Sequence, residues 1–415
     1  MTTLAETHPA RAACPAPRET LPLDRDVRFG DHHYTFHLRS GQDAWAELAA
    51  RLAGLNADHI FVVADTGVPA ATVRATLAAA GRASPVTLLT VPATEQAKNA
   101  ATVIDLAAQV IAAGGTRSSV VIGLGGGLAG NVAGTVAGWV YRGAPRLVQI
   151  PTTLLALSDS VVSLKQAINS PWGKNHLGCY KAPVFVWGHL DILRTLPAGE
   201  KRAALCETAK NVLAICPERY GELAGLLRAD AAYSDAELAW IVGLCLAAKQ
   251  SVMASDPYEA GEALVLEYGH TAGHAAEHLT GHLTGHLTEG RLAHGPAIAI
   301  GMLVAARVSA SLGYLSPADE RAHHRLLERN GTALRFPAGL SAEALLAAMR
   351  RDNKRGYHSP EPGRIDMVLL DALGRPHTER GRVLTQVPEG VVLDALRTRT
   401  TRPATQGPAT QGEPA

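Results

Sequence analysis

Residues 118–130, SSVVIGLGGGLAG, decide the fold class of this 415-residue chain. The apolar run at 118–123 is typical of a buried strand, and residues 131–141 have helical character. Between them, Gly125 to Gly130 satisfy G-x-G-x-x-G in the strand-to-helix context that gives the motif its meaning. Glycines allow a pyrophosphate to approach the backbone, and the N-terminus of the helix attracts its charge. The stretch therefore predicts a dinucleotide site.

Neighbouring residues limit what this motif can bind. A Lys-Ser/Thr pair is missing, which excludes a nucleoside-triphosphate P-loop, and no acidic residue follows about 20 positions later. Asp65, at the end of an earlier apolar run, is a candidate to hold the ribose instead. Thr152 and Thr153 follow the next strand and could contact the pyrophosphate or a ribose. The alternatives are a structural glycine turn and threonines that only cap a helix.

Outward from this motif, strand and helix patterns alternate. We expect strands at 59–64, 85–91, 118–123 and 146–150, and helices at 69–80, 100–113 and 131–141. This alternation predicts a parallel sheet with helices on both faces. Beyond residue 196 the strand signals fade, and helices are expected at 201–215, 235–255 and 264–278. The fold class is therefore an α/β, Rossmann-like N-terminal domain followed by a mostly α-helical C-terminal domain. The expected boundaries are a disordered extension at 1–25, the two domains at 26–195 and 196–397, and a disordered tail at 398–415.

Composition narrows the setting. With a net charge of +1, no bulk field recruits nucleic acid or an anionic membrane, so a phosphate ligand needs a local basic pocket. Five scattered cysteines without a CxxC pair favour a reduced, cytoplasmic setting over a disulfide framework. The first 20 residues contain no apolar signal-peptide core, and the apolar stretch 296–306 is too short to span a bilayer.

The helical half carries a candidate metal set. Glu207 lies one turn before Lys210, His270 and His274 are spaced to share one helix face, and His294 opens HGPAIAIGM. One glutamate and two histidines form a catalytic type of zinc or cobalt site with positions open for substrate oxygens. The alternative is a surface Glu207–Lys210 pair and histidines satisfied within their helix.

Two further segments could bind ligands. Lys165, Lys174 and Asn175 lie in SLKQAINSPWGKNHLG, expected to be a loop after the sheet whose donors suit a phosphate monoester. A solvated charged loop is the competing interpretation. The unit HLT recurs at His278, His282 and His286. We favour a duplicated surface loop over a histidine-rich metal tract.

Six motifs in a fixed order give a resemblance to a known family. GLGGGLAGNVAG, IPTTLLALSDS, GKNHLG, TLPAGEKRAALCETAKN, GHTAGHAAE and HGPAIAIGM, together with Asp65 and a weaker DNKR at 352–355, resemble the sugar phosphate cyclases of the dehydroquinate synthase superfamily. The resemblance implies NAD⁺, a divalent metal (Co²⁺ or Zn²⁺), a sugar phosphate substrate and a homodimer.

The resemblance also implies roles by position. Residues expected to line NAD⁺ are Asp65, Glu95, Lys98, Gly125, Gly126, Gly127, Leu128, Ala129, Thr152, Thr153, Lys174, Asn175 and Glu200, with Asp159 beside the nicotinamide and the substrate. Those expected to bind the metal are Glu207, His270 and His294. Those expected around the substrate or its phosphate are Lys165, Asn175, Lys210, Lys249, His274 and Lys354.

Departures from the family pattern bear on substrate choice. Ala263 replaces the arginine that helps receive a substrate carboxylate, and Glu267 replaces an asparagine. Both changes favour a neutral sugar ring that carries only a phosphate. Together with the segments SLKQAIN, WGHLDILRTLP and ETAKN, these two changes make the chain resemble the branch of the family that converts glucose 6-phosphate into the carbocycle of aminoglycoside antibiotics.

Catalytic roles are expected for two residues. Glu267, three residues before His270 and on the same helix face, would move protons or else orient a metal histidine. Lys165 would assist phosphate departure. The alternatives are a dehydroquinate synthase or a sedoheptulose 7-phosphate cyclase, a metal-dependent polyol dehydrogenase related to glycerol dehydrogenase, and a non-catalytic NAD-binding module.

Overall fold

The computed structural model describes residues 20–283, 292–351, 357, 359 and 361–400. The chain forms two compact units, Met1–Leu266 and Glu267–Ala415. The first unit contains strands β1 (Leu23–Phe29), β2 (His32–Arg39), β3 (Ile60–Asp65), β4 (Val86–Val91), β5 (Val120–Gly125), β6 (Arg146–Pro151), β7 (Lys165–Ser170), β8 (Gly173–Tyr180) and β9 (Phe185–His189). Its α-helices are α1 (Asp43–Ala53), α2 (Ala70–Gly81), α3 (Ala100–Ala112), α4 (Gly127–Trp139), α5 (Leu190–Leu193), α6 (Ala198–Ala214), α7 (Tyr220–Leu226) and α8 (Asp235–Met253).

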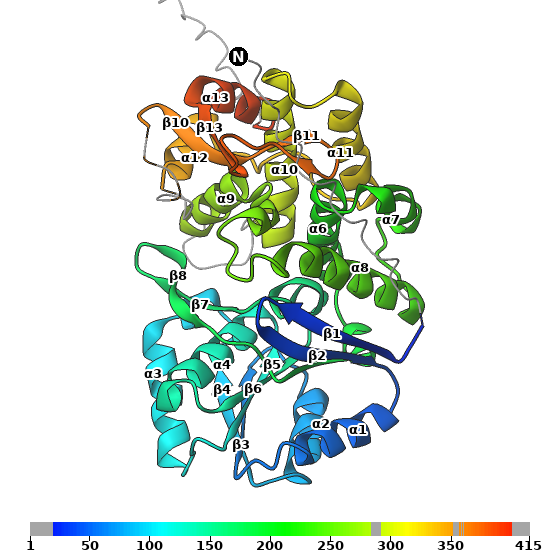
Figure 1. Cartoon of the computed structure of the whole chain (residues 1–415), viewed down its shortest axis with the longest axis vertical. Coiled ribbons are helices and arrows are strands. Elements are labelled where there is room, and N and C mark those ends of the chain that lie inside the picture. The colour runs from blue at the N-terminus through cyan, green and yellow to red at the C-terminus, as the bar shows by residue number, and fades with distance from the viewer. Residues whose placement is uncertain (1–19, 284–291, 352–356, 358, 360, 401–415) are drawn as a thin grey trace, which may run out of the picture. The chain divides into compact units, whose positions relative to one another are not determined.

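A seven-stranded sheet forms the centre of the first unit, in the order β1-β2-β9-β6-β5-β3-β4. Its strands pair in parallel except for β1, which is antiparallel to β2. Side chains alternate between the two faces. Helices α1 and α2 lie on one face of the sheet, and α3 and α4 lie on the other (Figure 1). Ile60 and Val62 of β3 belong to the core cluster with residues of α1 and α2, whereas Phe61 and Val63 belong to the cluster with residues of α3 and α4. The expected parallel sheet with helices on both faces is therefore confirmed.

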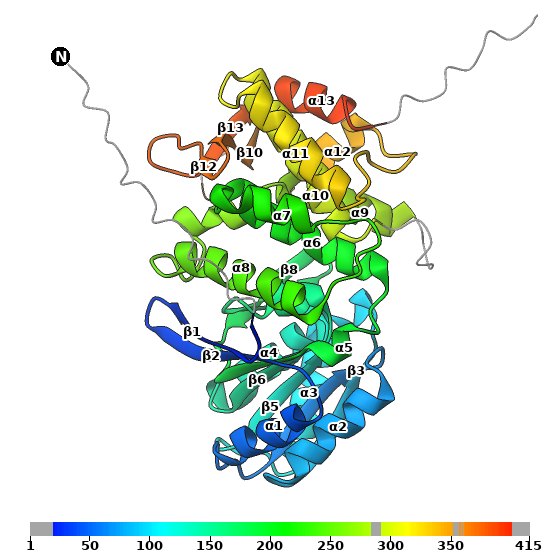
Figure 2. The ribbon, with the colours of Figure 1, turned by 90° about the vertical axis from the view of Figure 1, so that its right-hand side faces the viewer.

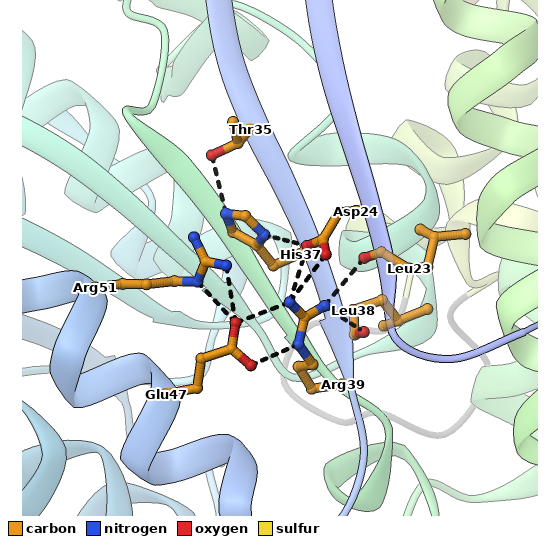
Figure 3. Close-up of polar contacts among 8 residues, drawn as sticks. All are labelled: Leu23, Asp24, Thr35, His37, Leu38, Arg39, Glu47 and Arg51. Carbon is orange, nitrogen blue, oxygen red and sulfur yellow. Dashed lines mark hydrogen bonds and ion pairs between the residues drawn. The ribbon is translucent and has the colours of Figure 1, made fainter.

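The β1–β2 hairpin was not expected from the sequence. Arg39 of β2 is 8% exposed and donates hydrogen bonds to Asp24 of β1 and to Glu47 of α1, which also accepts from Arg51 (Figure 3). His37 makes a further contact with Asp24. The hydrogen bonds from Arg39 and Arg51 lower the pKa of Glu47. This network joins the antiparallel edge of the sheet to the first helix.

A second unexpected hairpin replaces the predicted charged loop. Strands β7 and β8 pair antiparallel from Lys165↔Tyr180 to Ser170↔Gly173. The turn Ser170-Pro171-Trp172-Gly173 reverses the chain, because proline sets the backbone angle that such a turn needs. Lys165, Lys174 and Asn175 are therefore strand residues.

Helices α6 and α8 pack against each other within the first unit, and α8 also packs against β1 (Figure 2). Among the described residues, α8 alone is long and apolar enough to be a candidate membrane span, but 72% of its most apolar window is buried. A core helix meets the same criterion.

The predicted domain boundary at 195/196 precedes α6, whereas the compact units divide after Leu266. Cys216, after α6, is disulfide-bonded, whereas reduced cysteines were expected.

The second unit is mainly helical but includes short strands. Its helices are α9 (His270–Leu283), α10 (His294–Ser311), α11 (Pro317–Arg329), α12 (Ala342–Met349) and α13 (Glu389–Arg397). Its strands are β10 (Arg364–Val368), β11 (Leu370–Ala372), β12 (Arg375–Pro376) and β13 (Leu384–Pro388), which form the pairs β10–β13 and β11–β12.

The predicted helix at 264–278 is interrupted. Residues Glu262–Glu267 form a short 3-10 helix, and α9 begins only at His270. Gly269 separates them with a φ of +82°, a left-handed conformation that glycine adopts without steric cost. A Cβ at this position would also collide with Met302 of α10. Glu267 and His270 therefore do not share a helix face, contrary to the sequence-based expectation.

Candidate dinucleotide and metal sites

The glycine motif lies at the carboxyl end of β5. The α4 helix begins at Gly127, four residues earlier than expected, so the motif's own residues form its first turn. The Asp65 carboxylate at the end of neighbouring β3 accepts hydrogen bonds from the backbone N–H groups of Gly67 (2.9 Å) and Gly126 (3.3 Å). Gly125 has a φ of +151°, and a Cβ there would collide with Asp65 and Ala129. Asp65 therefore lies beside the glycine turn, where the sequence-based hypothesis of a ribose contact stays a prediction.

The threonines follow β6 at the same edge of the sheet. The Thr152 backbone N–H donates to the Gly125 carbonyl at 2.9 Å. Thr153 Oγ1 accepts from the N–H of Ala156, the first residue of a π-helical turn, Ala156–Ser160. Thr153 therefore acts as a cap, the alternative that the sequence left open. The same turn carries Asp159, and π-helical turns occur often at functional sites.

Three of the predicted cofactor residues meet at the β7–β8 hairpin. Lys98, only 8% exposed, donates from Nζ to Asn175 Oδ1 at 2.6 Å. Glu95, in a 3-10 turn, accepts from Asn169 Nδ2 at 2.7 Å. Asn169 was not predicted, because its partner lies 74 positions away. Lys174 lies on β8, and Glu200 is exposed in the first turn of α6.

Buried charges concentrate on α6 and α8. Glu207 and Lys210 of α6 form an ion pair and are 1% and 2% exposed. The alternative of a surface pair is therefore wrong. Lys249 of α8 is 6% exposed and pairs through Nζ with Asp159 Oδ1 at 2.8 Å. Charges with so little water around them need close partners. The first unit therefore brings four predicted site residues into two ion pairs, of which Glu207–Lys210 is fully buried and Lys249–Asp159 is partly buried.

Lys165 has a partner that the sequence did not reveal. Its Nζ lies 2.8 Å from Glu259 Oε2, and the Glu259 side chain is 9% exposed against 38% for Lys165. Glu259 sits in a left-handed backbone conformation, with a φ of +55°. The contact spans 94 positions and follows no local motif.

Three histidines cluster in the second unit. His270 and His274 project from α9 with ring centroids 5.1 Å apart, which confirms that they share a helix face. His294, the first residue of α10, lies 5.5 Å from the His270 ring and 6.2 Å from the His274 ring. Ligand atoms of His274, Glu277 and His294 all lie within 4.8 Å of one another, close enough to hold a metal ion. Glu277 was missed, although it lies one turn after His274 in the same motif.

Several predicted residues lie at or beyond the ends of the described segments. His278 and His282 belong to α9, whereas His286 and Lys354 lie outside the described residues. Most of the 1–25 and 398–415 extensions also lies outside them. Strand β1 nevertheless begins at Leu23, and the Arg399 carbonyl accepts from the Phe336 N–H at 2.9 Å.

Comparisons with known proteins define the class. Residues 88–203 match the family model "3-dehydroquinate synthase N-terminal", and residues 205–355 match "3-dehydroquinate synthase C-terminal". The chain therefore belongs to the 3-dehydroquinate synthase family.

Within that family, similarity is high to one kind of enzyme. A 2-deoxy-scyllo-inosose synthase of Streptomyces lividus is 42% identical over 365 residues, which cover 87% of this chain and 93% of that relative. Its counterpart from Streptomyces paromomycinus is 43% identical over 366 residues, covering 87% and 92%. A crystal structure of 2-deoxy-scyllo-inosose synthase complexed with carbaglucose-6-phosphate, NAD⁺ and Co²⁺ matches with a TM-score of 0.82 and 31% identity, covering 91% of this chain and 100% of that chain. Glycerol dehydrogenase from Schizosaccharomyces pombe, 16% identical with a TM-score of 0.60, shares the fold alone.

Proposed function

We propose that this chain converts D-glucose 6-phosphate into 2-deoxy-scyllo-inosose and inorganic phosphate, with NAD⁺ and a divalent metal. This carbon–oxygen lyase reaction would supply the carbocycle of 2-deoxystreptamine aminoglycoside antibiotics. The observation that carries the proposal is the similarity to named synthases along 87% of the chain. Ala263, which is fully buried, supports the proposal further, because its methyl group cannot pair with a substrate carboxylate as an arginine would.

The residues at the glycine turn fit NAD⁺. Gly125 to Ala129 start α4, whose first N–H groups favour a pyrophosphate, and the absence of side chains at Gly126 and Gly127 permits close approach. The acidic group suited to a ribose is Asp65, which already accepts from Gly126. The cofactor set proposed is Asp65, Glu95, Lys98, Gly125, Gly126, Gly127, Leu128, Ala129, Thr152, Thr153, Asp159, Lys174, Asn175 and Glu200.

The histidines of the second unit fit a Co²⁺ or Zn²⁺ ion. His270 and His294 supply imidazoles from separate helices, and we infer that the buried carboxylate of Glu207 completes the set. This donor set leaves positions open for substrate hydroxyls. When bound, NAD⁺ would accept and return a hydride at the sugar ring, and the metal would polarise ring oxygens as a Lewis acid.

The chain's own side chains would handle the phosphate and the protons. Lys165 would stabilise negative charge on the departing phosphate, while Glu259 holds its ammonium in place. Glu267 would move the proton at C5 or at the ring hydroxyls. The remaining residues proposed to contact the sugar or its phosphate are Asn175, Lys210, Lys249, His274 and Lys354.

A turnover experiment separates this proposal from its rivals. The full chain is incubated with Co²⁺, glucose 6-phosphate and NAD⁺ at one tenth of the substrate concentration. The proposal predicts complete phosphate release and a carbocyclic ketone without accumulation of NADH. Conversion of all the NAD⁺ to NADH, without phosphate release, would identify a polyol dehydrogenase instead. Phosphate release only from sedoheptulose 7-phosphate, or only from the acidic sugar phosphate of dehydroquinate synthases, would assign the chain to those cyclases.

We also infer a homodimer in the cytoplasm. The dimer is supported by the family resemblance, and light scattering should give twice the chain mass of 43.5 kDa. The location is supported by the free thiols of Cys179 and Cys245. Cell fractionation tests the location directly. Recovery outside the cytoplasmic fraction would overturn it.

A further inference from the structure

The link between α9 and α10 contains an unusual insertion. Residues 284–291 carry the later part of the HLTG repeat and separate α9 from His294, the first residue of α10. Contacts made by described residues show how His294 is held at the start of α10.

Two contacts join α9 to residues at, or just before, the start of α10. Thr280 Oγ1 donates to the Ala276 carbonyl at 2.8 Å and accepts from the Leu292 N–H at 3.3 Å. One turn earlier on α9, Glu277 Oε2 lies 3.1 Å from His294 Nδ1. Thr280 and Glu277 are both 3% exposed. We call this pair the Glu277–Thr280 clamp.

The Glu277 contact determines which nitrogen of His294 faces away from α9. A carboxylate oxygen accepts hydrogen bonds, so Nδ1 is the nitrogen of His294 that donates toward Glu277, and Nε2 is the nitrogen left to bind a metal. The same logic applies to His270, whose Nδ1 lies 3.2 Å from the Tyr268 carbonyl oxygen, also only an acceptor. Both rings thus present Nε2, and their centroids are 5.5 Å apart.

We propose that Glu277 is a positioning residue that fixes the tautomer and orientation of His294 for metal binding, with Thr280 holding the helices in register. The inference rests on the proposed function, of which the metal is a part. Carboxylates behind metal-binding histidines raise the basicity of the ring, and their loss typically costs 10- to 100-fold in metal affinity. The Glu277 side chain is 4% exposed, so water screens this effect little.

Direct ligation is the competing role for Glu277. Ligand atoms of His274, Glu277 and His294 lie within 4.8 Å of one another, so a carboxylate oxygen could itself bind an ion. The two roles differ in what the ion contacts. A positioning carboxylate leaves the number and type of ligand atoms unchanged when it is replaced, whereas a direct ligand does not.

The test measures Co²⁺ binding to the full, metal-free chain in competition with a chelator. Glu277→Gln keeps the side-chain shape but removes the charge, and should weaken Co²⁺ binding 10- to 100-fold while the visible spectrum at saturation keeps its position and intensity. Thr280→Val should weaken binding several-fold. The matched control is Glu320→Gln, because Glu320 of α11 pairs with Arg307 of α10 (3.6 Å), and its affinity should equal that of the wild type.

Three outcomes would overturn the proposal. Glu277→Gln could bind Co²⁺ within twofold of the wild type, or its saturated spectrum could show a changed coordination number, which would make Glu277 a ligand. If the wild-type chain binds no Co²⁺, the proposed function fails as well. Should Glu277→Gln not fold, Glu277→Asp provides the same test, because its carboxylate is one methylene too short to reach His294.

Discussion

Acid should destabilise the second unit through one buried histidine. His323 of α11 is fully buried. Its Nδ1 lies 2.8 Å from the Asp319 carbonyl oxygen, and its Nε2 lies 3.0 Å from the Tyr268 hydroxyl. Burial lowers the pKa of His323 from 6.5 to about 4. The folded protein therefore keeps the ring neutral at a pH where the unfolded chain protonates it.

The sign and size of the effect follow from this difference. Because the folded pKa is the lower one, the stability that His323 contributes is complete above pH 6.5 and is lost as the pH falls toward 4. The full loss is the difference of 2.5 pKa units multiplied by about 1.36 kcal/mol, or about 3 kcal/mol. At pH 5, with the unfolded form mostly protonated and the folded form mostly neutral, the loss is about 2 kcal/mol.

Hydrogen exchange can isolate this contribution. His323→Gln cannot be protonated but keeps an acceptor for Tyr268, so between pH 8 and pH 5 its α11 amides should lose about 2 kcal/mol less protection than those of the wild type. The control is His33→Gln, because the His33 side chain is 51% exposed. Equal pH slopes for the wild type and His323→Gln would refute the reasoning. Tryptophan fluorescence cannot replace this assay, because all five tryptophans precede residue 267.

The remaining predictions concern the proposed reaction. Lys165→Ala should lower kcat by roughly 100- to 1,000-fold without weakening NAD⁺ binding; an unchanged rate would remove Lys165 from phosphate departure. Glu267→Gln should bind NAD⁺ and Co²⁺ normally but lose at least about 100-fold in turnover, and full turnover would exclude the proton-transfer role. Gly125→Ala should weaken NAD⁺ binding at least about 10-fold in a fluorescence titration, because its Cβ would displace Asp65. Gly114→Ala, with nothing within 4 Å of its Cβ, controls for left-handed backbone strain, and equal losses in both variants would contradict the role of Asp65.

The dinucleotide edge of the sheet was predictable because its signals are local. The apolar run at 59–64 predicted β3, which forms at Ile60–Asp65, and the glycine motif placed the strand-to-helix turn at β5 and α4. Parallel neighbours then bring their carboxyl ends to one edge, so Asp65 meets Gly126 although 61 positions separate them. The local sequence pattern, combined with the rule that parallel strands end at the same edge, therefore accounts for the contact between Asp65 and Gly126.

The partners of the charged residues were not predictable, because they come from distant segments. Glu259 reaches Lys165 across 94 positions, and Asn169 reaches Glu95 across 74. The sequence predicts a loop where the β7–β8 hairpin with Lys165 and Asn169 forms, because the exposed strand β8 lacks the apolar alternation of a core strand. Without that hairpin, no pattern in the sequence could indicate which acids and amides its residues would contact.

The break before α9 makes the direction of the Glu267 side chain independent of the orientation of His270, which a continuous helix would have linked. In a continuous helix, Glu267 would point in the same direction as His270, and a change at residue 267 would act on the metal histidine through their shared face. Gly269 instead turns the chain through a left-handed conformation against α10, so the start of α9 is fixed by backbone packing with Met302. His270 is then oriented by the Tyr268 carbonyl, which no side-chain substitution removes. A substitution at residue 267 should therefore leave the positions of the α9 histidines unchanged, because their placement depends on Gly269 and on the Tyr268 carbonyl.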